Sequence, residues 1–186
     1  MRRVLFLAAF VACASQQNNI RIVKNFRDSR ERGDLTGAQA YIAPGARLWF
    51  EEKTGPGEPY TLSGGSWDHW DQYFHSRNEL SDWRTEGQSV TASVHETNDF
   101  MQMLDWHAPA YTMTWWLDDQ DRITGVLIKG GGKPTSRLDE FKAWAAKTHP
   151  DELAYLMPKG RIDPTGDRAE RWRAILEEWR RYGTNR

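Results

Sequence analysis

Groups that can move a proton gather in the middle of this 186-residue chain. Asp105, Glu96 and Glu51 supply carboxylates, His95 supplies an imidazole and Tyr111 a phenol, and tryptophan and methionine lie near them in the sequence. Burial beside such apolar side chains disfavours the charged form of a carboxylate, which raises its pKa towards the range used in general acid–base catalysis. We therefore expect acid–base chemistry or ligand binding here. The alternative is that these groups are solvated charges at strand ends.

Other kinds of catalytic site leave recognisable spacings, and the sequence lacks them. His69, His75, His95 and His107 form no HxxxH or HExxH pair, so we expect no metal site. A phosphate-binding glycine loop, a nucleophile elbow and a dinucleotide fingerprint are absent too, so we expect no cofactor. The formal net charge of −1 gives no reason to expect nucleic acid or an anionic membrane as a partner.

Four β-rich runs must position these groups, and they occupy residues 88–97, 100–106, 111–117 and 123–129. Val90, Ala92 and Val94 share one face of the first run, and Tyr111, Met113, Trp115 and Leu117 share one face of the third. The connections are too short for parallel crossovers, so we expect an antiparallel meander with one face on a core.

Helical spacing predicts helices on both sides of the meander. One helix is expected over Asn18–Arg32, ended by Gly33-Asp34, followed by a helical turn from Leu35 and a short strand over Ala46–Glu51. A further helix is expected after Ser66, with a stripe of Trp67, Trp70, Tyr73 and Phe74 that we expect to pack on the sheet. Three amphipathic helices follow the meander, at about 138–147, 151–157 and 164 or 167–182.

The first 17 residues have the layout of a bacterial secretory signal. Arg2-Arg3 is a basic start, Val4–Ala12 is an unbroken apolar run too short to span a bilayer, and Ala12-Cys13-Ala14 is a small-residue exit. We therefore expect an exported protein, periplasmic or extracellular. The alternative is a buried N-terminal strand or helix.

Two processing routes remain open for this segment. Cleavage after Ala14 releases a soluble protein that begins at Ser15. By contrast, Phe10-Val-Ala-Cys13 resembles a lipobox, in which the cysteine is lipidated and anchors the protein. Cys13 is the single cysteine of the chain, so the mature domain has no disulfide by either route.

Several segments resemble the α+β cone fold shared by nuclear transport factor two, ketosteroid isomerase and the SnoaL-like polyketide cyclases. Phe26–Leu35 is similar to the first helix with its Gly-Asp stop, and Tyr41–Trp49 to the entry into the first strand. Ser63–Trp67 is similar to the glycine-led opening of the third helix, and Asp118–Ile123 to the hairpin before the last strand. The resemblance covers roughly residues 18–129.

The resemblance implies a strongly curved antiparallel sheet wrapped around N-terminal helices to form a cone. The expected domains are a signal over 1–17, a SnoaL-like cone over 18–130 and a helical C-terminal extension over 131–186. Strand parity then predicts which residues line the cone: Val90, Ala92, Val94, Glu96, Met101, Met103, Asp105, Tyr111, Met113 and Trp115, with Trp67, Trp70 and Trp83 closing its sides.

Catalytic roles follow from the same resemblance. An Asp in such a cone abstracts a proton next to a carbonyl while a Tyr donates to the enolate, which implies Asp105 as base and Tyr111 as donor. A scytalone dehydratase-like group of Asp105, His107 or His95, and Tyr111 is a related arrangement. Glu51 lies beside the position of the isomerase base, where Phe50 aligns equally well.

We therefore expect an exported protein that binds a small hydrophobic or aromatic molecule in an apolar cone, with cofactor-free isomerase, dehydratase or cyclase chemistry as an option. The alternative is a non-catalytic interaction module, in which the outer sheet face and the C-terminal helices form a homodimer or bind a partner protein. The two expectations differ in one feature. Catalysis needs a carboxylate or histidine buried in the cone beside a proton donor, whereas an interaction module does not.

Overall fold

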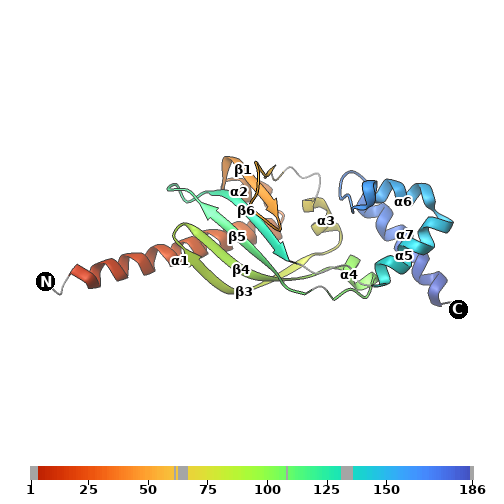
Figure 1. Cartoon of the computed structure of the whole chain (residues 1–186), viewed down its shortest axis with the longest axis horizontal. Coiled ribbons are helices and arrows are strands. Elements are labelled where there is room, and N and C mark those ends of the chain that lie inside the picture. The colour runs from red at the N-terminus through yellow and green to blue at the C-terminus, as the bar shows by residue number, and fades with distance from the viewer. Residues whose placement is uncertain (1–3, 61, 63–66, 108, 131–135, 185–186) are drawn as a thin grey trace. The chain divides into compact units, whose positions relative to one another are not determined.

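A computed structural model describes the backbone of residues 4–60, 62, 67–107, 109–130 and 136–184 (Figure 1). Two compact units make up the chain. The first takes its described residues from 1–62, 79–94 and 110–130, and the second from 63–78, 95–109 and 131–186. Each unit has its own hydrophobic core.

The first unit contains a six-stranded mixed sheet with the strand order β2-β1-β6-β5-β4-β3 (Figure 1). Its strands β4 and β5 and its strands β5 and β6 pair antiparallel, whereas β1 and β6 pair parallel. The expected α+β class with a curved sheet is confirmed, with one parallel pair added to it. The elements are α1 (Val4–Glu31), α2 (Leu35–Gln39), β1 (Ile42–Phe50), β2 (Glu58–Pro59), β3 (Arg77–Glu86), β4 (Ser89–Thr97), β5 (Tyr111–Leu117) and β6 (Ile123–Gly130).

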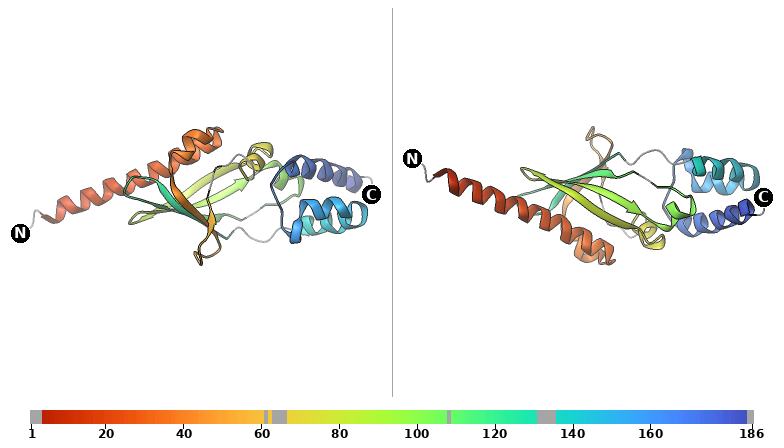
Figure 2. Two further views of the ribbon diagram at one scale, coloured as in Figure 1. Left: turned by 90° about the horizontal axis from the view of Figure 1, so that it is seen from above. Right: turned by 90° about the horizontal axis from the view of Figure 1, so that it is seen from below.

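Alternation along β4 and β5 builds the core of this unit. Val90, Ala92 and Val94 are buried, as are Met113 and Trp115 on the neighbouring strand. They pack in one cluster with the apolar face of α1, formed by Ile22, Val23 and Phe26. Figure 2 shows α1 running along one face of the sheet. The predicted inward set of these two strands therefore does face a core.

The first strand begins earlier than the sequence suggested. The strand was expected to begin at Ala46, but β1 starts at Ile42 and so contains Pro44 and Gly45. The register with β6 shifts between Ile42 and Arg47, and Gly45 adopts a positive φ of 76°. A bulge of this kind accepts both residues within a strand, since glycine tolerates that backbone and the bulge leaves one residue unpaired.

The strand expected over residues 100–106 is wrong. Residues Asp99–Met103 form a helix, α4, because Asn98 caps its first turn and the buried Phe100, Met101, Met103 and Leu104 follow helical spacing. Met101, Met103 and Asp105 therefore do not share a strand face. Among the four predicted strands, this one is a helix. The sequence Asn98-Asp99 is typical both of a turn and of the start of a helix.

Helices form the second unit, which contains α3 (Trp67–Tyr73), α4, α5 (Ser136–Thr148), α6 (Pro150–Leu156), a 3₁₀ turn η1 (Pro158–Gly160) and α7 (Arg168–Thr184). The three helices predicted after the meander are confirmed. The aromatic stripe of α3, expected on the sheet, packs instead in this unit, where Trp70 contacts Phe100 and Phe100 contacts Trp172 at ring-centroid distances of 5.0 and 5.2 Å.

The N-terminal helix continues through the segment predicted as a signal. α1 begins at Val4 and ends at Glu31, beside the predicted Gly33-Asp34 stop, where Gly33 has a φ of 72°. Within the described residues, no helix combines the length and apolar character needed to cross a bilayer. Ser66, after which a helix was expected, lies outside the described residues.

The alternation along β5 generates a stability prediction. Trp115→Ala should lower the free energy of unfolding by about 3–5 kcal/mol, because it removes a fully buried indole and leaves a cavity. Trp116→Ala is the matched control on the opposite face and should cost about 1 kcal/mol. Urea unfolding followed by circular dichroism measures both. Equal losses from the two variants would contradict the assignment of the faces.

Candidate functional site

A cavity of about 330 Å³ lies within the second unit, between the end of β4 and the turn that follows α4. Its walls include His95 and Glu96 from the strand, and Asp105, Trp106 and His107 from the turn. Five residues named as site candidates from the sequence therefore border one cavity: His95, Glu96, Met101, Asp105 and His107. Its volume lies at the lower end of the range for small-molecule sites.

The amide of Asn98 holds one wall of this cavity in place. Asn98 is buried, and its Oδ1 accepts a hydrogen bond from the backbone N–H of Met101 at 2.8 Å, which caps α4. Its Nδ2 donates to Glu96 Oε1 at 2.9 Å and to Ser76 Oγ at 3.3 Å. One side chain thus starts the helix and fixes the Glu96 carboxylate, and a cap of this type is worth about 1 kcal/mol.

A Schellman motif ends α4 and fixes the backbone conformation of Asp105. The backbone N–H of Trp106 donates to the carbonyl of Met101 at 2.8 Å, and that of Asp105 donates to the carbonyl of Gln102 at 3.2 Å. The residue at the centre of this motif needs a left-handed backbone, and Asp105 has a φ of 49°. Glycine usually occupies that position, and aspartate is one of the few other residues that adopt the conformation.

Asp105 and His107 form an open acid–base pair on this turn. Asp105 Oδ1 lies 3.5 Å from His107 Nε2, and the two side chains are 76% and 93% exposed, respectively. The pair is therefore not the buried carboxylate or histidine that the sequence analysis asked for, but a ligand in the cavity can reach both groups without any change in the fold. The imidazole can take or give a proton, and the carboxylate can orient it.

An aspartate, an arginine and a histidine tie α4 to the other helices of its unit. Asp99 Oδ2 accepts from Arg173 Nη2 of α7 at 2.8 Å and lies 2.9 Å from His75 Nδ1, just after α3. The hydrogen bond from Arg173 is the main cause that lowers the pKa of Asp99, with His75 adding to it against the opposing effect of burial. In return, Asp99 raises the pKa of Arg173.

The other predicted site residues lie in the two cores or at their edges. Met113 and Trp115 are buried in the first unit, and the Trp83 ring stacks on Trp115 at a centroid distance of 6.3 Å. Tyr111 is half-buried at the margin of the same core. In the second unit Trp70 and Met103 are buried, whereas Trp67 is exposed. Their ligand-binding and catalytic roles remain predictions.

The predicted trio is divided between the units. Asp105 and His95 border the cavity of the second unit, whereas Tyr111 starts β5 in the first. The sequence analysis missed Asn98 and Trp106, the residues that shape the cavity. Asn98 could have been found from the sequence. It is a typical helix-capping residue, it is followed by an acidic residue, and the apolar residues after it have helical spacing.

Two further histidines, His69 and His149, lie within hydrogen-bonding distance of glutamates of α7. His69 Nε2 lies 3.1 Å from Glu170 Oε1, and His149 Nε2 lies 2.9 Å from Glu178 Oε1, so both connect helices of the second unit. Across the residues that the structure describes, no three His, Cys, Asp or Glu side chains are grouped as metal ligands would be.

Comparison with known proteins gives similarity of fold at low identity. No protein-family model matches the chain, and no curated protein matches it. A proposed polyketide cyclase from Sinorhizobium meliloti is 17% identical, with a TM-score of 0.45 over 59% of this chain and 94% of that one. An NTF2-like protein of unknown function from Cytophaga hutchinsonii is 10% identical, with a TM-score of 0.44 over 66% and 94%.

A SnoaL-like protein of unknown function from Burkholderia thailandensis is also 10% identical, with a TM-score of 0.44 over 63% of this chain and 98% of its own. The chain is thus similar to SnoaL-like and NTF2-like proteins. At these identities and TM-scores, no functional residue of theirs transfers to this chain.

The Asp99 ion pair generates a pH prediction. A carboxylate whose pKa is lower in the folded state stabilises the protein above its unfolded value, about 3.9, and this contribution is lost as the pH falls through the folded value. Between pH 7 and pH 3, Asp99→Asn should therefore lose less stability than the wild type. Urea unfolding at the two pH values provides the measurement.

Arg173→Gln is the companion variant, because it removes the main cause of the lowered pKa. Its acid-induced loss of stability should be smaller than that of the wild type, because the folded pKa of Asp99 then lies closer to its unfolded value. Parallel losses in the wild type and in Asp99→Asn would contradict a stabilising role for this ion pair.

Proposed function

We propose that the protein binds a small molecule in the cavity between β4 and the turn after α4, and that Asp105 and His107 transfer a proton there. The observation that carries the proposal is the convergence of His95, Glu96, Asp105 and His107 on one cavity of about 330 Å³. Ligand sites combine apolar walls with a few placed polar groups. Met101 and Trp106 supply the apolar part of this wall.

The arrangement of charges favours a ligand with one apolar and one hydrogen-bonding end. Glu96 is already held by the Asn98 amide, so its carboxylate keeps a constant position. Asp105 and His107 stand at the open side of the cavity, where a carbonyl or hydroxyl of the ligand can meet them. Proton transfer by a positioned imidazole or carboxylate typically contributes a factor of about 10²–10⁴ in rate.

This site differs from the cone that the family resemblance implies. Val90, Ala92 and Val94, which were expected to line the cone, are fully buried against α1. The ligand that fits the proposed site is therefore smaller and more polar than the hydrophobic molecule expected from the sequence. Isomerisation or dehydration next to a carbonyl needs one base and one acid, and both are present in the Asp105–His107 pair.

Export belongs to the same proposal. The basic start, the apolar run and the Ala12-Cys13-Ala14 exit of the first 17 residues support secretion. Loss of that segment removes Arg2 and Arg3 and changes the formal charge from −1 to −3. Lipidation of Cys13 and homodimer formation also stay predictions.

Ligand capture by native mass spectrometry tests the site. The purified protein is mixed with a bacterial metabolite extract, and the wild type should retain a small molecule that Trp106→Leu loses, because the variant removes the indole wall. Trp67→Leu is the control, since Trp67 is exposed and does not line the cavity. Retention of the ligand by Trp106→Leu would place it elsewhere and contradict the proposal.

Proton transfer by Asp105 is tested separately, by comparing two aspartate variants. Asp105→Asn should still bind the captured molecule but slow its conversion by about 10²-fold or more, whereas Asp151→Asn, an exposed change on α6, should convert it at the wild-type rate. Equal conversion by both variants would rule out proton transfer at Asp105, and the protein would then act in binding alone.

A further inference from the structure

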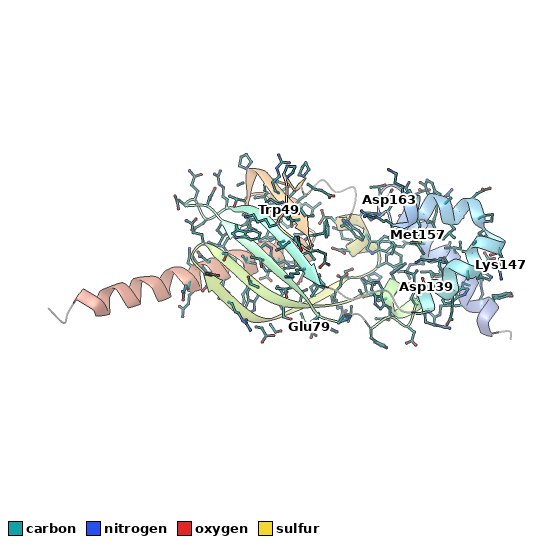
Figure 3. The ribbon with its side chains drawn as sticks, viewed as in Figure 1. Trp49, Glu79, Asp139, Lys147, Met157 and Asp163 are labelled. Carbon is teal, nitrogen blue, oxygen red and sulfur yellow. The ribbon has the colours of Figure 1, made fainter. Side chains whose placement is uncertain are left out.

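Two tryptophans meet at a right angle on the face of the sheet opposite the core. Trp49 comes from β1 and Trp116 from β5, with ring centroids 6.0 Å apart and an interplanar angle of 85°. Trp115 points into the core, so Trp116, the next residue of the strand, lies on the other face. Both rings are half-buried, and Trp49 is labelled in Figure 3.

A glycine in the intervening strand lets the two rings meet. Gly125 of β6 pairs with Trp116 on one side and with Arg47 on the other. A Cβ at Gly125 would lie 2.7 Å from the Trp49 ring and 3.5 Å from the Trp116 ring. Any larger residue would separate the indoles, so this position keeps an open corner between them.

The loop after β1 fixes the Trp49 ring from its other side. The Trp49 Nε1–H donates to the carbonyl of Gly55 at 3.3 Å. Gly57 has a φ of 65°, and a Cβ there would lie 2.6 Å from the same indole. Two glycines and one hydrogen bond therefore hold Trp49 in place, which is more restraint than a half-exposed side chain ordinarily has.

Lys53, from this loop, occupies the corner. Its Nζ lies 3.8 Å from the centroid of Trp116 and 5.1 Å from that of Trp49, over the faces of both rings. The face of an indole carries negative charge, so two perpendicular rings attract a cation placed between them. Lys53 shows that the corner accepts an ammonium group at the distances of a cation–π contact.

We propose that the Trp49–Trp116 corner is a binding site for a soluble small organic cation with a quaternary or methylated ammonium group, and that Lys53 fills it when no ligand is bound. A lysine ammonium is strongly hydrated and leaves N–H donors to satisfy, whereas a quaternary ammonium has none, so aromatic walls suit it better. The local charge also favours cations, because three acidic residues, Glu51, Glu52 and Glu58, outnumber Lys53 over residues 51–58.

Choline is the probe, measured by calorimetry and by the NMR signal of the Trp49 indole. Lys53→Ala should bind choline about fivefold more tightly than the wild type, because the competing lysine contact is worth about 1 kcal/mol. Lys24→Ala is the matched control, since Lys24 lies 5.2 Å over the single ring of Trp83 and should leave choline affinity unchanged. Trp116→Leu should lose binding.

Three results would overturn the proposal. The first is equal binding of 3,3-dimethylbutan-1-ol, which has the shape of choline without its charge. The second is the absence of saturable choline binding to a Lys53→Ala protein that keeps the wild-type Trp49 indole signal. The third is binding to phosphatidylcholine vesicles without binding to free choline, which would replace the soluble ligand by a membrane surface.

Discussion

The side-chain amide of Asn98 is the interaction on which the candidate site depends. It caps α4 through the N–H of Met101 and holds the carboxylate of Glu96, so one buried group sets both the helix and the strand end that border the cavity. The Schellman motif then turns the chain so that Asp105 and His107 meet. Because the amide is buried, its loss takes away the acceptor of the buried Met101 N–H, which is costly.

A second set of contacts keeps this segment on its neighbouring helices. Arg173 donates to Asp99 and also to the carbonyl of Tyr73, which joins α7 to both α4 and α3. Phe100, at the start of α4, packs among the rings of Trp70, Phe74 and Trp172. Polar bonds thus orient the short helix, and aromatic packing buries the ring at its start.

The sequence predicts the periodic elements well and non-local relations poorly. β4 and β5 follow from alternation, β6 follows from its apolar and β-branched composition, and the helices after the sheet follow from apolar stripes. α4 was mistaken for a strand because five residues are too few to separate the two periods. His95, Glu96 and Asp105 were singled out by their chemistry. The contact of Trp49 with Trp116 depends on strand register and on Gly125, which no local pattern reveals.

Native-state hydrogen exchange in the wild type and in Asn98→Ala tests the central claim most directly. If the Asn98 amide holds the candidate site, the variant should lose protection at the amides of residues 101–106 and keep it at residues 112–116 of β5. The sheet residues belong to the first unit and have a separate core. Unchanged protection at 101–106, or an equal loss in the sheet, would contradict the account.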